Sequence, residues 1–123
     1  MIFGVRFKDG VQLKGSPGGV RILATFDHVA QVIGHDITVT SGNDGIHSGP
    51  GDPHFKGDAL DCRTHDLPDK QAALKAMQDF AGDRFFFWIE DEGLPNEHIH
   101  GQVKRGTVYP PVEIESSIDE ADA

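Results

Sequence analysis

Residues 68–80 constrain the fold more than any other segment of the chain. Their apolar side chains recur every three to four positions, at Ala73, Leu74, Met77 and Phe80. This spacing predicts a helix with one apolar face. Pro68 at its front and Gly82 after its end are residue types common at those places. Because such a helix must bury its apolar face, the chain has to fold into packed layers.

The remaining segments predict one more helix and four strands. The second helix is expected over residues 20–33, with Ser16 and Pro17 as a start signal and Gly34 as a stop signal. Its apolar stripe consists of Val20, Leu23, Phe26, Ala30 and Ile33. Strands are expected where β-branched and aromatic residues concentrate, over residues 37–41, 58–64, 84–90 and 98–103.

The order of these segments predicts an α+β domain in which two helices pack on a mainly antiparallel sheet. The strands over 84–90 and 98–103 are expected to form a hairpin-like pair, with the aromatic run 85–88 in the core. A length of 123 residues suits one domain, which we place at residues 1–112. Residues 113–123 are acidic and are predicted to form a disordered tail.

Composition excludes several classes of protein. A net charge of -9 without a cluster of Lys and Arg argues against nucleic acid as the main partner. No stretch approaches the ~20 apolar residues of a membrane span, and the N-terminus lacks the pattern of a signal peptide. We therefore expect a soluble monomer made in the cytoplasm. The single Cys62 allows no intrachain disulfide and is expected to be a small buried hydrophobe, so a metal would help to stabilise the domain.

Four of the seven histidines stand near carboxylates or tight turns, where metal ligands are expected: His47, His54, His98 and His100. His54 precedes Asp61 by seven positions, and Gly57 allows the chain to turn between them, so the two side chains can converge on one metal. A catalytic zinc site uses three protein ligands and leaves a fourth position for water. His98 and His100 offer the third ligand.

Two blocks carry a more specific signal. The first has the spacing H-x-x-G-x-A-x-D at His54, Gly57, Ala59 and Asp61, preceded two positions earlier by Asp52. The second places Glu97 three positions before His100. Together with residues 40–45 they span about half the chain. In this order the blocks resemble the zinc D-alanyl-D-alanine carboxypeptidases and L-alanyl-D-glutamate endopeptidases, which share a fold with the hedgehog signalling domain.

The resemblance implies zinc on His54, Asp61 and His100, with Glu97 as the general base that takes a proton from the zinc-bound water. Glu97 and His100 have opposite parity and would point to opposite faces of one regular strand. The strand is therefore expected to begin after Glu97, or to bulge there.

The sequence departs from the family in two places. The family's first block begins with serine, where this chain has Asp52; a carboxylate there could orient His54 as a hydrogen-bonding partner. The family also carries an arginine upstream of the first block, to stabilise the oxyanion, and residues 37–41 contain none. Arg63, His47 and His98 are the candidates for binding the substrate or the oxyanion, with Arg21 of the first helix as a further one.

The resulting interpretation is a zinc metallopeptidase that hydrolyses an amide bond in the stem peptide of peptidoglycan, either as a carboxypeptidase or as an endopeptidase. Such a small domain suits a phage-type lysis enzyme that reaches the cell wall after release or delivery, and a bacterial origin is equally compatible. One alternative is a non-catalytic zinc-binding domain on the same fold that is a structural part of a phage particle or binds the cell wall, a hypothesis that gains if His98 supplies a fourth protein ligand. A small metal-binding barrel that uses His98 and His100 is a third possibility.

Overall fold

The structure, a computed structural model, describes residues 2–42 and 57–104. Its elements in chain order are β1 (Val5–Phe7), α1 (Pro17–Ile33), β2 (Ile37–Ser41), β3 (Ala59–Arg63), α2 (Lys70–Ala81), β4 (Phe85–Glu90) and β5 (His98–Val103). The strands form one sheet in the order β1-β2-β3-β5-β4. Only β1 and β2 are parallel, and the other three pairs are antiparallel. The predicted α+β class with a mainly antiparallel sheet and two helices is therefore confirmed.

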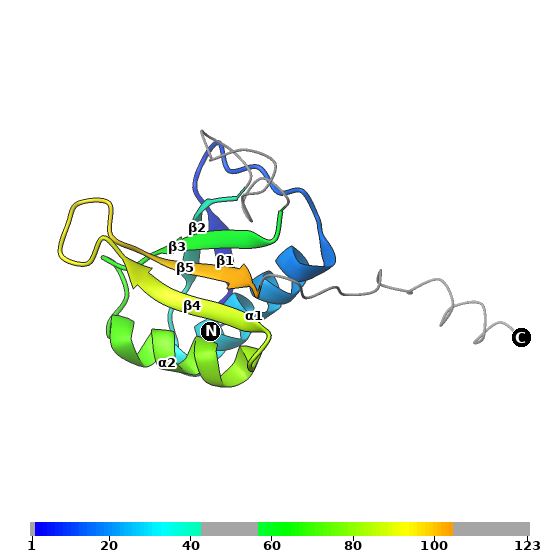
Figure 1. Ribbon diagram of the computed structural model, residues 1–123. Coiled ribbons are helices and arrows are strands. Elements are labelled where there is room, and N and C mark those ends of the chain that lie inside the picture. Colours follow the sequence, from blue (N-terminus) through cyan, green and yellow to red (C-terminus); the bar gives the residue numbers. More distant parts are fainter. Residues whose placement is uncertain (1, 43–56, 105–123) are drawn as a thin grey trace, which may run out of the picture.

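Both helices lie on the same side of the sheet (Figure 1), where α1 contacts β3 and β5, and α2 contacts β4. The start and stop signals of α1 act as predicted. The Ser16 side chain accepts a hydrogen bond from Gly19 N, and Gly34 adopts a left-handed conformation with φ of 67°. In α2 the capping residue is Asp69, which accepts from Ala72 N.

Strand β1 is absent from the sequence prediction. Its three residues are too few to show a period, and Asp36 just before β2 holds them in place. Gly4 N donates to Asp36 Oδ1 at 2.9 Å, and Arg6 Nε donates to Asp36 Oδ2 at 2.6 Å. A contact across thirty residues thus determines this strand, and local residue preference does not reveal it.

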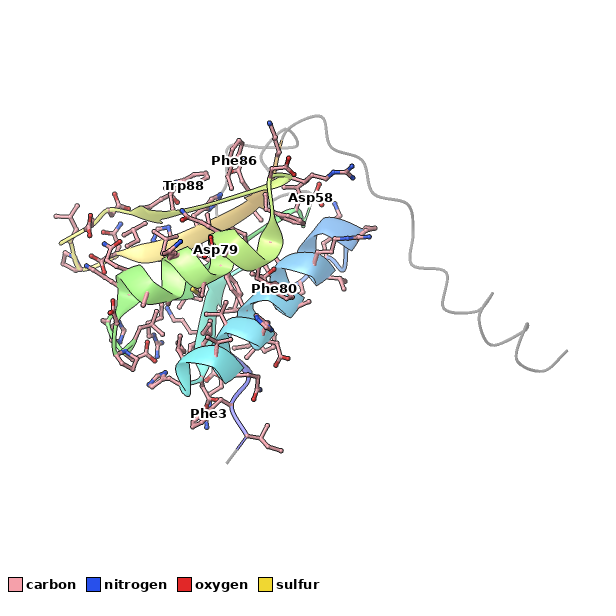
Figure 2. All side chains as sticks on the ribbon, turned by 90° about the horizontal axis from the view of Figure 1, so that it is seen from below. Phe3, Asp58, Asp79, Phe80, Phe86 and Trp88 are labelled. Carbon is pink, nitrogen blue, oxygen red and sulfur yellow. The ribbon has the colours of Figure 1, made fainter. Side chains whose placement is uncertain are left out.

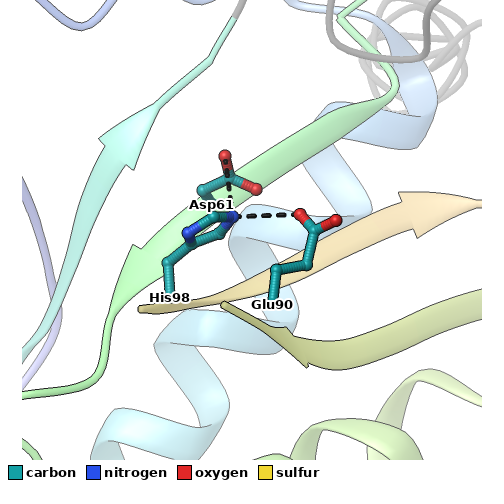
Figure 3. Close-up of side chains that lie close together, drawn as sticks. All are labelled: Asp61, Glu90 and His98. Atoms are coloured by element: carbon teal, nitrogen blue, oxygen red, sulfur yellow. Dashed lines mark hydrogen bonds and ion pairs between the residues drawn. The ribbon is translucent and has the colours of Figure 1, made fainter. Parts of the chain in front are cut away.

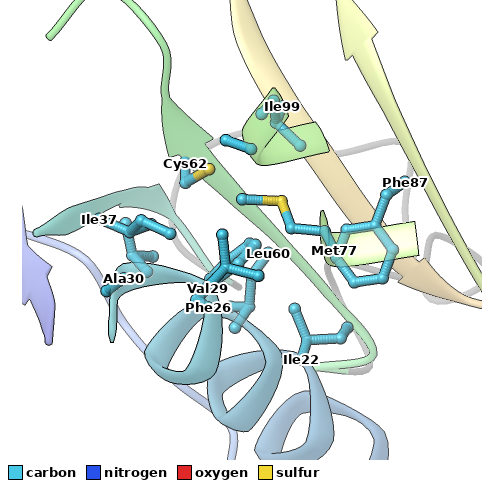
Figure 4. Packing of buried hydrophobic residues seen from close by; sticks show 12 residues of the cluster. Ile22, Phe26, Val29, Ala30, Ile37, Leu60, Cys62, Met77, Phe87 and Ile99 are labelled. Carbon is cyan, nitrogen blue, oxygen red and sulfur yellow. The ribbon is translucent and has the colours of Figure 1, made fainter. Parts of the chain in front are cut away.

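The core lies between the sheet and the helices (Figure 4). Its fully buried side chains include Ile22, Phe26, Val29, Cys62 and Met77. The predicted stripe of α1 is partly wrong. Val20 is 45% exposed, whereas Ile22 and Val29 are completely buried. Two three-to-four spacings overlap at Phe26 in this helix, and packing against the sheet selects the one that runs through Ile22 and Val29.

The aromatic strand β4 divides between the two faces of the sheet. Phe87 is buried, as predicted for the core, but Phe86 and Trp88 are 45% and 37% exposed. Figure 2 shows these two side chains projecting from β4 away from the helices. The prediction that the whole run lies in the core is therefore wrong, because strand neighbours alternate and the helices cover only one face.

The first turn of α1 contacts the chain just before β3. Ser16 Oγ lies 2.8 Å from the carbonyl oxygen of Gly57 and 2.6 Å from Asp58 Oδ1. Gly19 allows this approach, because a Cβ added there would lie 2.4 Å from the Gly57 carbonyl oxygen. The cap of α1 thus positions the segment that leads into Asp61.

Replacing Gly19 with alanine is therefore expected to lower the free energy of unfolding. In an isolated helix this change stabilises by about 1 kcal/mol. A loss of stability in Gly19→Ala would therefore indicate the clash with the Gly57 carbonyl oxygen. Urea unfolding of Gly19→Ala checks it, with Gly4→Ala as control, because a Cβ at Gly4 meets nothing closer than 3.4 Å. A variant more stable than the wild type would contradict the packing argument.

Several sequence predictions fall outside the described residues. These are the acidic tail 113–123 and the domain boundary at residue 112. Within residues 2–42 and 57–104, neither helix combines the length and the apolar character of a membrane span.

Candidate metal centre

The face of the sheet opposite to the helices carries a cluster of acidic and histidine side chains. The strand register places Asp61 of β3 opposite His100 of β5, and Glu90 of β4 opposite His98 of β5. Because side chains alternate along a strand, these four lie on one face, whereas their chain neighbours point into the core. Three strands therefore contribute to one site.

Asp61 and His100, both selected by the sequence motifs, are in direct contact. Asp61 Oδ1 lies 2.8 Å from His100 Nδ1, and both residues are buried. The His100 ring also packs against Trp88, with 4.6 Å between ring centroids. A buried carboxylate is unfavourable unless it is paired, so this contact determines where the Asp61 side chain lies.

Glu90 and His98 complete the cluster. Glu90 Oε1 lies 3.0 Å from His98 Nε2 and 3.5 Å from His100 Nδ1, and Asp61 Oδ2 lies 3.7 Å from His98 Nε2. Figure 3 shows the Asp61 and Glu90 carboxylates converging on the His98 ring. The sequence prediction did not include Glu90. The predicted hairpin of residues 84–90 and 98–103 carried a signal for Glu90, because pairing the residues of its two strands outward from the turn places Glu90 opposite His98.

The hydrogen bonds of the two rings define which nitrogens face the carboxylates. His98 Nδ1 lies 2.7 Å from the Asn96 carbonyl oxygen, and His100 Nε2 lies 2.8 Å from Gln102 Oε1. These oxygens can only accept, so each of these nitrogens carries a proton and donates. In a neutral ring the other nitrogen then has a lone pair, which here points at a carboxylate oxygen. The lone pair and the carboxylate oxygen are then two acceptors that face each other, and a cation bound between them would remove this conflict.

The arrangement fits a metal ion. Metal-bound histidines characteristically donate their other ring N–H to an oxygen acceptor, as both do here. Zinc ligands at about 2.0–2.2 Å and tetrahedral angles lie roughly 3.3–3.6 Å apart, close to the 2.8–3.7 Å between these carboxylate oxygens and ring nitrogens. Asp61, Glu90 and His98 could therefore bind a metal ion. Nitrogen and oxygen donors suit several divalent cations, so the donors alone do not identify the metal.

The charge around His98 favours a cation at this position. Burial lowers the pKa of His98, but the hydrogen bond to Asn96 and the carboxylates of Asp61 and Glu90 outweigh it, so the net shift is upward. A metal and a proton would compete for the same ring nitrogen.

Glu97, the predicted general base, lines a pocket next to this cluster, but its carboxylate is held by other partners. Strand β5 begins at His98, so Glu97 precedes the strand, as the parity argument requires. Its carboxylate accepts hydrogen bonds from Lys70 Nζ at 2.8 Å, from Thr64 Oγ1 and from Gly93 N at 2.8 Å. These donors lower the pKa of Glu97 to about 2. A carboxylate with so low a pKa is a weak base.

These contacts predict how stability depends on pH. The folded-state pKa of Glu97 lies below its ordinary value of 4.5, so its contribution is present above about pH 4.5 and is lost as the pH falls toward 2. Unfolding of the wild type and of Glu97→Gln should therefore differ most near neutral pH, and the difference should shrink through this window.

Glu92→Gln is the matched control for that experiment, because Glu92 lies 3.6 Å from the same Lys70 but is 57% exposed. It should change stability little at any pH. A difference between wild type and Glu97→Gln that stays constant down to pH 2 would contradict the assignment.

A pocket of about 350 Å³ opens beside the cluster. Its lining includes Asp61, His98, Glu97 and Arg63, all predicted site residues. Arg21 lies elsewhere, because it belongs to α1 on the covered side of the sheet and donates to the carbonyl of Pro17 at 3.2 Å.

The other predicted site residues lie outside the described part of the chain. These are His47, Asp52 and His54. The predicted role of Cys62 as a buried hydrophobe is confirmed, because its side chain is fully buried in the core and burial raises the pKa of its thiol.

No protein-family model, curated protein sequence or solved structure matches this chain. The resemblance to zinc peptidases therefore depends on the two motif blocks alone, and the hedgehog-like form of the fold stays a prediction.

Proposed function

We propose that this protein is a zinc-dependent peptidase that hydrolyses an amide bond in the stem peptide of peptidoglycan. The observation that carries the proposal is the contact between Asp61 and His100. These two residues are 39 positions apart and were chosen as ligands from separate motif blocks. The contact supports a metal site here, because it joins two ligand types of zinc next to a pocket that Asp61 lines.

In this proposal Asp61 and His100 hold the metal together with His54, the ligand predicted from the first block. A bound zinc supplies a water that is acidic enough to act as a nucleophile near neutral pH. Gln102 fixes the His100 ring, and Asn96 fixes the His98 ring next to it. The adjoining pocket holds the peptide against the cluster.

Two carboxylates compete for the role of general base. Glu97 is the base that the resemblance implies, but three hydrogen bonds hold it. Glu90 lies 3.0 Å from His98 Nε2 and is 39% exposed, so water and substrate can reach it. Glu97→Gln and Glu90→Gln decide between them: the variant that loses hydrolysis by at least about a hundredfold while keeping its zinc identifies the base.

The test of the function combines zinc content with the release of amino groups from purified peptidoglycan, with and without a chelator. We expect one zinc per chain and release that stops when the chelator is added and resumes when zinc is restored. Zinc without release would refute the peptidase and leave a metal-binding protein. A chain that takes up no zinc would refute the ligand assignment as well.

A second function, a non-catalytic zinc-binding domain, is favoured by one observation. Asp61, Glu90, His98 and His100 together offer four ligand atoms, and a structural zinc site closes with four protein ligands. In that case zinc should raise the unfolding temperature strongly, and no substrate should exchange onto the metal.

A further inference from the structure

The two edge strands of the sheet, β1 and β4, differ in how well they are protected against pairing with another chain. An edge strand presents unpaired backbone N–H and C=O groups, and proteins protect such edges by keeping them short or charged. Strand β1 has three residues and carries the charged Arg6 in its middle. Strand β4 has six residues, and those over 85–89 are all aromatic or aliphatic. Strand β4 is therefore the edge better suited to pair with a further strand.

The hydrogen bonds between β4 and β5 indicate which residues of β4 face outward. Lys104 N donates to the Arg84 carbonyl oxygen at 2.9 Å, so the even-numbered residues of β4 bond to β5. Bonding alternates along an antiparallel pair. Three residues therefore direct their backbone N–H and C=O groups to the side of β4 away from β5, which we call the outer edge: Phe85, Phe87 and Ile89.

One side chain of α2 reaches the outer edge. Gln78 Nε2 donates to the Phe87 carbonyl oxygen at 3.0 Å. A carbonyl oxygen can accept a second hydrogen bond, and Gln78 is exposed, so its side chain can also turn away. This contact therefore does not prevent a further strand from pairing there.

Residues 84–90 are complementary to themselves when two copies of the strand run antiparallel. In the register centred on Phe87, position 84 lies opposite 90, 85 opposite 89 and 86 opposite 88. Arg84 then faces Glu90 of the second copy, and Phe86 faces Trp88 of the second copy. Opposite charges and aromatic pairs are favourable contacts between neighbouring strands, and the two-fold symmetry of such a pair makes each contact twice.

The same register also suits the backbone and the exposed side chains. It places the outward-facing residues opposite one another, so each pair of them can exchange both N–H···O bonds. The positions between them come closer, to about 4.5 Å between Cα atoms. Phe86 and Trp88 occupy such positions and are 45% and 37% exposed (Figure 2). Pairing would remove much of this apolar surface from water.

We propose that this chain forms a two-fold symmetric dimer, in which β4 pairs antiparallel with β4 of a second copy in the register centred on Phe87, and Arg84 of each copy contacts Glu90 of the other. The inference goes beyond the proposed peptidase function, because the pairing requires neither zinc nor substrate. It also differs from the monomer expected from the sequence.

The dimer would bring a residue of the second copy to the candidate metal centre. Glu90 Oε1 lies 3.0 Å from His98 Nε2, and Figure 3 shows the other carboxylate oxygen of Glu90 directed away from this ring. An arginine on the neighbouring strand can bind that oxygen through a charge-assisted hydrogen bond. Arg84 of the second copy would thus hold the Glu90 carboxylate in place beside His98, and each site would depend on both chains.

The first test uses the wild-type protein, with sedimentation to measure its mass and NMR to measure hydrogen exchange of its backbone amides. We expect the amides of Phe85, Phe87 and Ile89 to exchange at least about tenfold more slowly in the dimer than in the diluted chain. The amides of Phe86 and Trp88 are internal controls, because they face β5 and should be protected even on dilution. A chain that sediments as a monomer at about 1 mM, or a dimer in which all three outer amides exchange rapidly, would overturn the proposal.

The second test reverses the two charges in separate chains. Arg84→Glu and Glu90→Arg each place like charges opposite one another in this register, so each should raise the dissociation constant of its dimer at least about tenfold. In an equimolar mixture of the two variants, both contacts again join opposite charges. We therefore expect the mixture to form a heterodimer with an affinity close to that of the wild type.

Lys8→Glu is the matched control for net charge, because it makes the same charge change as Arg84→Glu but follows β1 at the other edge of the sheet. It should keep the wild-type dissociation constant. Two variants that dimerise as tightly as the wild type, or a mixture that forms no heterodimer, would overturn the proposed register. Unfolding midpoints measured for each chain show whether its fold is intact, and the exchange measurement on the wild type decides the matter if a variant does not fold.

Discussion

Replacing Asp61 with asparagine is expected to lower the zinc affinity of the protein by at least about a hundredfold and to remove hydrolysis. Losing a group that only supports a ligand already costs 10- to 100-fold, and we propose that Asp61 is itself a ligand. Its two oxygens lie near both histidines, Oδ1 at 2.8 Å from His100 Nδ1 and Oδ2 at 3.7 Å from His98 Nε2. Asparagine keeps the shape but carries no charge and has only one oxygen.

The asparagine variant should remain folded. Its amide can donate to a ring nitrogen that faces a carboxylate oxygen in the wild type, so the buried site keeps a hydrogen bond. Zinc affinity is measured by competition with a chromophoric chelator, and folding by urea unfolding of the metal-free protein. The control is Asp79→Asn, which removes an exposed carboxylate that pairs with Lys75. If Asp61→Asn bound zinc as tightly as this control, the metal would not lie at the cluster.

Replacing Phe26 with alanine should give the largest loss of stability, about 3–5 kcal/mol. Phe26 is completely buried in the middle of α1 and makes an edge-to-face contact with Phe87 of β4, with ring centroids 6.2 Å apart. Its removal leaves a cavity where the helix crosses the sheet. Since the free energy of unfolding of domains of this size is only about 5–15 kcal/mol, a large fraction of the molecules would be unfolded at moderate temperature.

Urea unfolding measures this loss, with Phe80→Ala as the matched control. Phe80 is also on a helix but is 50% exposed, and it stacks on His28, so its loss should amount to about 1 kcal/mol or less. Similar losses for the two variants would show that the core does not lie where α1 meets the sheet.

Local signals account for the parts of the fold that the sequence predicted correctly. Strands β2 and β5 have the predicted bounds, Ile37–Ser41 and His98–Val103, because glycine, proline and polar residues mark where each ends. The buried face of α1 was placed too far toward Val20, since more than one apolar spacing is present and only the sheet decides between them. Strand β1 depends on Asp36, which no local pattern reveals.

In the candidate site, too, local sequence signals reveal some residues, whereas others depend on contacts between distant parts of the chain. Asp61 and His100 could be chosen from spacing within short motifs, and both belong to the cluster. Glu90 belongs to no motif, and it could be found only by working out the register of the predicted hairpin, which pairs it with His98. The engagement of Glu97 with Lys70 was equally hidden, since it joins the start of β5 to the first turn of α2. Contacts within a motif are visible in a sequence, and contacts between strands are not.

Within residues 2–42 and 57–104, the helices cover one face of the sheet and not the other, which we call the open face, and this gives adjacent residues of one strand separate tasks. In β5, Ile99 holds the core while its neighbours His98 and His100 face the cluster; in β3, Leu60 and Cys62 flank Asp61 in the same way. Changes on the open face need not disturb the core, and substitutions on opposite faces that lie more than about 7–10 Å apart and share no partner should be nearly additive in stability. A new ligand set or a new specificity could therefore be introduced at alternate positions of β3, β4 and β5 while the same buried residues keep the domain folded.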